Sequence, residues 1–300
     1  MAIWSLVLPE SGQQLVIANA MPGSGLQHAR QGGISRAASG AGSVDDMGPK
    51  RPRSWRLRFE LLSQAERGLL YAAWLDGGAV WLIDPTQKNL MHPNVSTAGA
   101  AHRTVDGWTV TGGTVTRIDP VTIVPPVQMA HTISRVNPAA GENIDLGYMN
   151  PSAWDLYATL TPVVEPAEQY TFSVYAKIAA ASPAQTIALK FTHYTIPGGS
   201  GVDDIGGNLA VTTAWQRYAR TITMPAGKGR VWNGLVTGTG TTNTLHLTAP
   251  QLEKAAVASA WAPGQGPALV VITGYEEPYS YPRAEYTDAD LTLEEIGGPL

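Results

Sequence analysis

Residues 54–61 are Ser54-Trp55-Arg56-Leu57-Arg58-Phe59-Glu60-Leu61, in which large apolar residues alternate strictly with charged or polar ones. Because successive side chains of a β-strand point to opposite faces of its sheet, this alternation predicts a half-buried strand. Its buried face would carry Trp55, Leu57, Phe59 and Leu61, and its outer face would carry the charges. The stretch therefore predicts a β-sheet that lies with one face on a core.

The period of the sequence changes immediately afterwards, in residues 63–77. Ser63 and Glu66 have the spacing of a capping box, in which each side chain pairs with the backbone N–H group of the other residue. Apolar residues then recur at helical spacing, and Gly77-Gly78 ends the pattern. The sequence predicts one helix here, followed by a strand over residues 79–83 that Asp84-Pro85 ends.

Residues 91–262 consist of short alternating runs joined by turns rich in Gly, Pro and Asn. No helical period separates these runs, so they predict about seven to ten short strands of a β-sandwich or jelly roll. The runs are residues 108–118, 129–136, 170–178, 186–193, 217–224, 229–237 and 244–250.

The two ends of the chain contain further short strand patterns. Alternation is visible in residues 1–35, and residues 269–272 and 289–296 each predict a strand. Residues 37–52 are small and Gly-rich and then abruptly charged, which predicts a long loop.

The arrangement of these segments predicts an insertion. The first block ends on an open sheet edge and the final segment is too short to fold alone, so pairing between them would close the sheet. We expect an outer domain of residues 1–90 plus 263–300, with a second domain of residues 91–262 inserted into it. The predicted fold class is all-β with one helix in the outer domain: a split β-sandwich or barrel with an inserted β-jelly roll.

Composition limits the functions that are plausible for this chain. The net charge of −4 provides no field that attracts nucleic acid, and the charged fraction of 15% indicates that partners cover part of the surface. The absence of cysteine excludes disulfides and zinc–thiolate sites and fits assembly in a reducing host cytoplasm. The beginning of the sequence lacks a basic segment and no apolar run approaches roughly 18 residues, so we expect no signal peptide and no membrane insertion.

A pattern shared by both ends of the chain resembles a known family. It consists of Arg53-Ser54-Trp55-Arg56-Leu57-Arg58-Phe59, Glu66-Arg67-Gly68-Leu69-Leu70, Val80-Trp81-Leu82-Ile83-Asp84-Pro85, Asn89-Leu90 and the ending Asp288-Ala289-Asp290-Leu291-Thr292-Leu293-Glu294-Glu295. Over residues 1–90 and 268–300 it resembles the N-terminal domain of the distal tail and minor tail proteins of siphophages. The resemblance implies a strand, one helix, a strand with an Asp-Pro turn, and a last strand that completes the same domain.

The inserted region carries a second resemblance. Asn89-Leu90 and Asp106-Gly107-Trp108-Thr109-Val110 stand at its start, and Pro250-Gln251-Leu252-Glu253-Lys254 and Trp261-Ala262-Pro263 stand at its end. This pattern resembles the carbohydrate-binding-module-like jelly rolls of phage structural proteins. Trp261 occupies a position where a Tyr is more usual.

Together the resemblances imply a non-enzymatic virion protein of the distal tail. The outer domain would form a ring, most often hexameric, that joins the tail tube protein to the hub, tip or baseplate. The jelly roll would project outward and contact host-surface glycans.

Aromatic residues of the insertion are the candidate glycan contacts. Sugars stack on exposed rings, so the loop-like Trp154 and Tyr148 are the main candidates, with His193 and Tyr194 as secondary ones. Core packing is the alternative for rings on strands, and we favour it for Trp215 and Trp232.

Few residues indicate a cofactor or a catalytic site. The six histidines are scattered and no metalloprotease, phosphate-loop or nucleophile-elbow motif is present, so no cofactor is expected. Asp203 and Asp204 lie in a Gly-rich segment and are candidate ligands for a structural Ca²⁺, although adjacent carboxylates usually point apart.

Two other classes of protein remain open. The first is a trimeric receptor-binding or side-fibre tail protein, in which the jelly roll is the main functional part. The second is a secreted glycan-active enzyme with an accessory module. A domain built from both chain ends and the expected lack of a signal peptide favour the distal tail protein, and the sequence singles out no acid pair of the kind that the enzyme would need.

Overall fold

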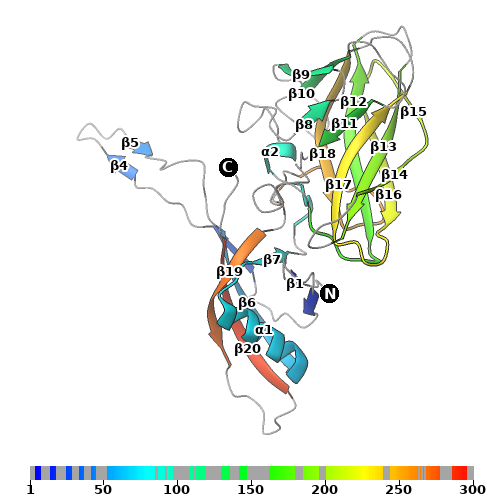
Figure 1. The fold of residues 1–300 in the computed structure, drawn as a ribbon. Helices are drawn as coiled ribbons and strands as arrows, with labels where there is room; N and C mark the ends of the chain where they lie inside the picture. Colours follow the sequence, from blue (N-terminus) through cyan, green and yellow to red (C-terminus); the bar gives the residue numbers. More distant parts are fainter. Residues whose placement is uncertain are drawn as a thin grey trace. The chain divides into compact units, whose positions relative to one another are not determined.

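The computed structural model describes residues 4–7, 14–17, 25–28, 34–36, 42–44, 53–84, 87–91, 93–96, 108–110, 113–118, 130–135, 142–146, 162–179, 185–195, 201–238, 244–262, 264, 266, 268–277 and 286–295. Its contacts divide the chain into two compact units (Figure 1). Unit 1 comprises residues 1–85 and 268–300, and unit 2 comprises residues 86–267. No helix in the described part of the chain is long and apolar enough to cross a membrane.

Unit 1 is built on one seven-stranded antiparallel sheet whose order is β2-β1-β7-β19-β20-β6-β3. Its strands are β1 (Trp4–Val7), β2 (Gln14–Ile17), β3 (Gly25–His28), β6 (Arg53–Ser63), β7 (Val80–Ile83), β19 (Ala268–Glu276) and β20 (Tyr286–Glu295). The neighbours β7 and β19 pair through Leu82 and Ala268, although the whole of unit 2 separates them in sequence. The chain therefore leaves the sheet at one strand and returns at the adjacent one.

Strand β6 follows the predicted alternation except at its end. Trp55, Leu57 and Phe59 are buried, but Leu61 is 45% exposed and Leu62 is buried instead. Leu61 has a φ of 56°, and the pairing with β20 shifts there because Thr287 pairs with Leu62 and Ala289 pairs with Phe59. The prediction that Leu61 faces the core was wrong, since a β-bulge moves the next residue onto the buried face.

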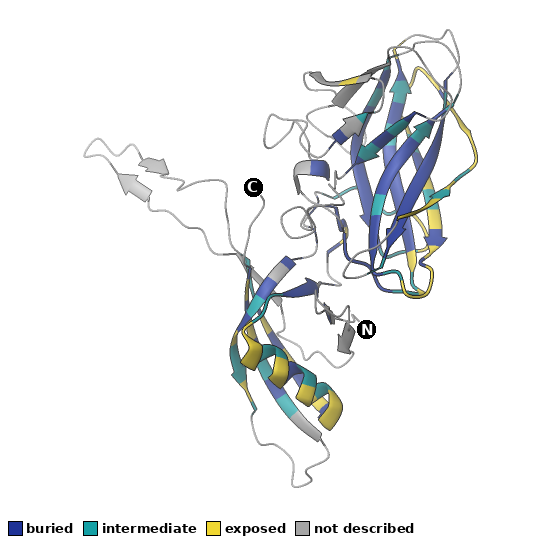
Figure 2. Cartoon of the chain, viewed as in Figure 1, coloured by how far each residue is buried: buried dark blue, intermediate teal, exposed yellow. Residues whose placement is uncertain are grey.

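The predicted helix is present as α1 (Gln64–Asp76). The Ser63 hydroxyl accepts a hydrogen bond from the Glu66 N–H at 3.3 Å, and the Glu66 carboxylate accepts one from the Ser63 N–H at 2.8 Å. Gly77 ends the helix in the left-handed conformation, with a φ of 63°. The helix contacts β19, β6 and β20, and Figure 2 shows that its outward side is exposed. The core of unit 1 lies between this helix and the sheet.

Asp84, the residue after β7, joins this strand to β6 in unit 1. Asp84 is buried and accepts a hydrogen bond from the Trp55 indole N–H at 3.2 Å. A bidentate pair between Arg53 and Glu295, with N–O distances of 3.0 and 2.7 Å, joins the beginning of β6 to the end of β20. Residues from both chain ends are thus tied to the same strand.

Unit 2 is a β-sandwich of two antiparallel sheets, as the jelly-roll prediction required. The five-stranded sheet has the order β16-β12-β18-β10-β9, and the six-stranded sheet has the order β14-β13-β17-β11-β8, with β15 paired to β13. The strands are β8 (Trp108–Val110), β9 (Gly113–Ile118), β10 (Ala130–Arg135), β11 (Asn143–Leu146), β12 (Gln169–Ile178), β13 (Gln185–Tyr194), β14 (Val202–Ile205), β15 (Leu209–Val211), β16 (Gln216–Thr223), β17 (Arg230–Thr237) and β18 (Leu245–Glu253), and a one-turn helix α2 (Pro93–Ser96) precedes them. All seven runs predicted from alternation coincide with strands, and the all-β class is confirmed.

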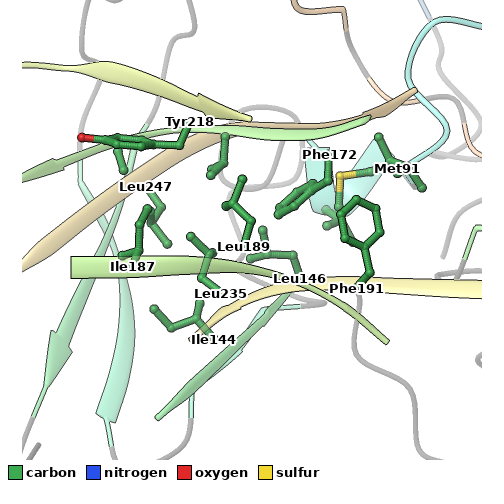
Figure 3. Packing of buried hydrophobic residues seen from close by; sticks show 14 of the residues in the cluster. Met91, Ile144, Leu146, Phe172, Ile187, Leu189, Phe191, Tyr218, Leu235 and Leu247 are labelled. Carbon is green, nitrogen blue, oxygen red and sulfur yellow. The ribbon is translucent and has the colours of Figure 1, made fainter. Parts of the chain in front are cut away.

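The core of unit 2 lies between its two sheets. Phe172, Tyr218 and Leu247 of the five-stranded sheet meet Leu189, Phe191 and Leu235 of the six-stranded one (Figure 3). The rings of Phe172 and Phe191 are edge to face, with centroids 6.1 Å apart. Interdigitation of this kind fixes the separation of the sheets and leaves each with one outward face.

Asn89 explains where unit 2 begins. Its amide N–H groups donate to the carbonyl oxygens of Pro250 and Ala262 at 3.2 and 2.9 Å, and its amide oxygen accepts from the Met91 and Leu252 N–H groups at 3.1 and 3.2 Å. These bonds bring the Asn-Leu pair against the Gln-Leu-Glu strand. Residues 86–90 and 263–267 consequently group with unit 2, so the predicted boundaries at 90/91 and 262/263 fall inside it.

Four strands arise where the sequence did not predict them. Strands β11 and β15 have no counterpart among the predicted runs, and β14 lies in the segment 198–207 that was expected to be a Gly-rich loop. Part of the expected loop over residues 37–52 is strand β5 (Gly42–Val44), which pairs with β4 (Ile34–Arg36). The rest of that loop lies outside the described residues.

Candidate functional site

Of the four predicted glycan contacts, the structure describes only His193 and Tyr194. Trp154 and Tyr148 lie outside the described residues. His193 and Tyr194 are the last two residues of β13, where they are only 4% and 7% exposed. A ring must be accessible to stack on a sugar, so neither presents a stacking surface as placed.

Tyr194 belongs to the outward face of the six-stranded sheet. Ile187, Leu189 and Phe191 of β13 point into the core, so the alternate residues Lys190, Thr192 and Tyr194 point outward. The register extends this face to Trp232 and Gly234 on β17, to Asn143 and Asp145 on β11, and to Asp203 on β14. We call these eight residues the outer face of the six-stranded sheet.

An ion pair lies at the middle of this outer face. The Lys190 Nζ is 2.8 Å from Asp145 Oδ1 and donates to Asn143 Oδ1 at 3.0 Å. Gly234 separates the two charged residues in the register, and a Cβ there would lie 2.6 Å from the Ile144 carbonyl oxygen and 3.0 Å from Asp145 Oδ1. The missing side chain therefore leaves the space through which the ammonium group reaches Asp145.

Burial shapes the electrostatics of the outer face. Burial raises the pKa of Asp145. The hydrogen bond and the charge of Lys190 lower that pKa, but not enough to offset burial, and the charge of the nearby Asp203 raises it further. Burial, followed by the charges of Asp203 and Asp145, raises the pKa of Tyr194 to about 12. The phenol is therefore neutral near pH 7, and the two carboxylates are close enough to influence the same groups.

The structure does not bring Asp203 and Asp204 together. Asp203 accepts a hydrogen bond from the Thr192 hydroxyl at 2.6 Å on the outer face. Asp204, the next residue of β14, points to the other side of the strand and pairs with Arg220 of β16. They lie in a strand rather than a loop, and their carboxylates do not converge on a common Ca²⁺ position. No group of three or more metal-ligating side chains occurs in the described ranges.

His193 points to the opposite side of β13 from Tyr194. Both of its ring nitrogens are buried without a hydrogen-bond partner among the described residues. Burial lowers its pKa, which the charges of Asp204 and Asp203 partly oppose, whereas Lys228 and Arg220 lower it further. His193 is therefore neutral near pH 7 and does not share a face with the tyrosine that follows it.

Two tryptophans expected in the core lie outside it. Trp232 is half-buried on the outer face, with Lys190 Nζ 5.8 Å from its ring centroid and with its indole N–H unpaired among the described groups. Trp215 precedes β16 and is half-buried against Ala249, Tyr175 and Trp261. The prediction of core positions was wrong for both, because the register places the Trp232 ring on the outward side of β17 and because Trp215 lies before β16, outside the core between the sheets. Strand residues alternate in direction, and the sequence alone did not reveal which alternation faced the core.

The outer face combines an aromatic ring with polar groups suited to hydroxyls. Trp232 offers a half-buried indole ring, and Asn143, Asp145 and Asp203 offer acceptors at half-buried or exposed positions. A sugar hydroxyl both donates and accepts hydrogen bonds, and its ring stacks on an aromatic face. This arrangement can bind a saccharide. Of the eight residues of the outer face, the sequence analysis named only Tyr194 and Asp203 as candidate binding residues.

Comparison with models of known protein families and with curated proteins finds no match. Among solved structures, the chain is similar to the enzymatically active domain of tailspike protein 4 of bacteriophage CBA120, at 18% identity and a TM-score of 0.41, over 56% of this chain and 21% of that one. It is also similar to the C-terminal family 22 carbohydrate-binding module of Clostridium thermocellum Xyn10B, at 16% identity and a TM-score of 0.37, over 55% of this chain and 92% of that one. A xylan-binding domain of family 22 is matched at 17% identity and a TM-score of 0.39, over 58% of this chain and the whole of that one. The chain thus spans about a fifth of the tailspike domain's length, and these likenesses concern fold alone.

Proposed function

We propose that this chain is a non-enzymatic structural protein of the distal phage tail, in which unit 1 assembles and unit 2 contacts host-surface glycans. The observation that carries the proposal is the path of the chain through unit 1. It leaves at β7 and returns at the adjacent β19, so unit 1 is a complete sheet that carries unit 2 as an insertion. Apart from Asn89-Leu90, the residues that resemble distal and minor tail proteins lie mainly in β6, α1, β7 and β20 of unit 1.

Assembly is the proposed role of unit 1. A ring of identical subunits, most plausibly a hexamer, uses a single type of head-to-tail interface and closes without free ends. In the virion such a ring would join the tail tube protein on one side to the hub, tip or baseplate on the other. The proposal requires no cofactor.

Adhesion is the proposed role of unit 2, through the outer face of its six-stranded sheet. A single aromatic ring and a few hydrogen bonds give affinities in about the millimolar range, roughly −4 kcal/mol. Repetition around a ring raises the effective concentration of later contacts, so weak sites add up to useful avidity. Trp154 and Tyr148 stay predicted contacts of the same unit.

The oligomeric state tests the assembly proposal. We expect mass photometry and averaged electron micrographs of the purified chain to show closed rings of six copies. A trimer would support the receptor-binding or side-fibre alternative. A persistent monomer of 31.8 kDa, found both in solution and after incubation with tail tubes as a template, would refute ring formation.

Variants of single rings test the adhesion proposal. We expect Trp232→Ala, Trp154→Ala and Tyr148→Ala to weaken adsorption to host cells while the thermal unfolding of unit 2 stays unchanged. Thr212→Ala, an exposed position before β16, serves as the matched control. Normal adsorption by all three ring variants would exclude these contacts, and cleavage of an adsorbed glycan by the purified chain would contradict the non-enzymatic assignment.

A further inference from the structure

The outward face of the five-stranded sheet carries a second group of aromatic and basic side chains. Trp215 lies immediately before β16, and Lys177 and His246 are cross-strand neighbours on β12 and β18. The Lys177 Nζ is 5.1 Å from the Trp215 ring centroid, and the His246 ring stands edge to face on Trp215 at 6.4 Å between centroids. Three separate segments thus place an indole, an ammonium and an imidazole in contact. We call these three residues the Trp215 group.

The charge near the Trp215 group is positive. Among the described residues no carboxylate lies within 4 Å of the Lys177 ammonium, which instead lies over the indole ring of Trp215. The acid of this face, Glu253, is buried at the far end of β18. It already accepts hydrogen bonds from Gln251 Nε2 and from the Ser259 N–H, both at 2.8 Å. Lys177 therefore has a charge for which the described chain supplies no counter-ion.

His246 supplies a second unsatisfied group at the same place. Both of its ring nitrogens are shielded from solvent and lack a hydrogen-bond partner among the described groups, although the residue itself is half-buried. Burial, and then the charge of Lys177, lowers the pKa of His246, so the ring is neutral near pH 7. Because those nitrogens are shielded, the neutral imidazole offers no hydrogen bond to a ligand, and its role is to pack edge to face with the Trp215 indole.

We propose that the Trp215 group is a second saccharide site, selective for a sugar that carries a carboxylate, such as a uronic acid residue. The pyranose stacks on the indole of Trp215 and its carboxylate pairs with Lys177. The cation–π contact that Lys177 now makes is weak at an accessible site, so the ammonium exchanges it for the carboxylate at little cost. This site is on the opposite sheet from the outer face that contains Trp232, and it binds independently.

Calorimetric titration of the full chain tests the site, with a galacturonic acid trimer and a neutral galactose trimer as probes at low ionic strength. We expect the acidic trimer to bind about threefold to fivefold more tightly, which is the ratio that one accessible ion pair supplies. Lys177→Met keeps the aliphatic stem and removes the charge, so it should abolish this preference. Trp215→Ala should remove binding of both probes at this site, and Trp232→Ala should leave the acid preference unchanged.

Lys228→Met is the matched control, because it removes one positive charge from a turn between β16 and β17. Equal affinity of the native chain for both trimers, or no binding of either up to millimolar concentration, would overturn the proposal. An equal loss of acid preference in Lys177→Met and Lys228→Met would also overturn it, since net charge would then explain the effect. If Trp215→Ala fails to fold, the comparison of the two lysine variants still decides the question. Failure here with weakened adsorption in Trp232→Ala would leave the glycan contact of the six-stranded sheet intact.

Discussion

The two units bury one face of a β-sheet in different ways. Unit 1 covers a single seven-stranded sheet with α1, and its inner strands β19 and β20 come from the C-terminal part of the chain. Unit 2 packs two sheets on each other, and all of its strands come from one continuous stretch. Unit 1 therefore depends on pairing between distant segments, whereas unit 2 contains everything that its core requires.

The largest effect that separates the units should come from deleting β19 and β20. Truncation after Pro267 removes the partners of β7 and β6 and exposes Trp55, Leu57 and Phe59. We expect unit 1 to lose its protection from hydrogen exchange entirely while unit 2 keeps its own. Hydrogen-exchange mass spectrometry of the truncated and full chains measures this.

Excision gives the complementary control. Joining Pro85 to Ala268 through a short Gly/Ser linker removes unit 2 but keeps both segments of unit 1, whose strands β7 and β19 already lie side by side. We expect a folded unit 1. Protection of β6 in the truncated chain, or an unfolded product of the excision, would contradict the dependence of unit 1 on the C-terminal strands.

Core truncations should separate the units at the level of single residues. Phe59 and Phe172 are each fully buried, in the cores of unit 1 and unit 2 respectively. Replacement by Ala should cost about 3–5 kcal/mol in the unit concerned, from lost burial and the cavity left behind. Differential scanning calorimetry should show that Phe59→Ala lowers one unfolding transition and Phe172→Ala the other. If either variant shifts both transitions equally, the units do not unfold independently.

Asn89 tests to which unit the boundary segment belongs. Asn89→Ala removes four hydrogen bonds and leaves buried backbone groups on Pro250 and Leu252 unsatisfied. We expect the free energy of unfolding of unit 2 to fall by about 2–4 kcal/mol, because unpaired buried polar groups carry their full desolvation cost. Lys88→Ala at the exposed neighbouring position is the control and should change little. A loss of stability confined to unit 1 would return residues 86–90 to the outer domain.

The sequence predicted local structure where chemistry and period agree. The capping box at Ser63 and Glu66 depends on neighbours within one turn, and the alternating runs of unit 2 have a period of two, so both were recognisable without the fold. The bulge at Leu61 was not, because it arises from the pairing of β6 with β20, whose residues are far away in sequence.

The candidate site was less predictable than the fold for a related reason. Which face of β17 carries Trp232 depends on the register with β13, and the contact of Lys190 with Asp145 crosses a third strand at Gly234. Likewise, Asp203 and Asp204 are consecutive residues that the strand directs to opposite sides. The residue types indicated which side chains could bind a ligand. Only the pairing of strands that are distant in sequence determined which of these side chains share a face.

The smallest expected effect concerns Gly68, in the middle of α1. A glycine in a helix interior costs about 0.5–1 kcal/mol relative to Ala, because the unfolded chain gains backbone freedom. Nothing lies within 4 Å of the position that a Cβ would take, and the residue borders a surface hollow of about 420 Å³ with Gln64, Arg67 and Tyr71. No packing in the described chain therefore requires a glycine there. We expect Gly68→Ala to stabilise unit 1 by about 0.5–1 kcal/mol in denaturant unfolding, since a methyl group meets no neighbour.

The reverse change at Ala72, one turn later on the same exposed side of α1, is the matched control for Gly68→Ala. Ala72→Gly should destabilise unit 1 by a similar amount, and neither change should move the transition of unit 2. Mass photometry of the Gly68→Ala variant adds a second readout. If the stabilised subunit no longer forms rings, a neighbouring subunit approaches the helix backbone at Gly68. Unchanged rings would place the interface elsewhere, and a destabilised subunit would show that the methyl group meets an obstacle.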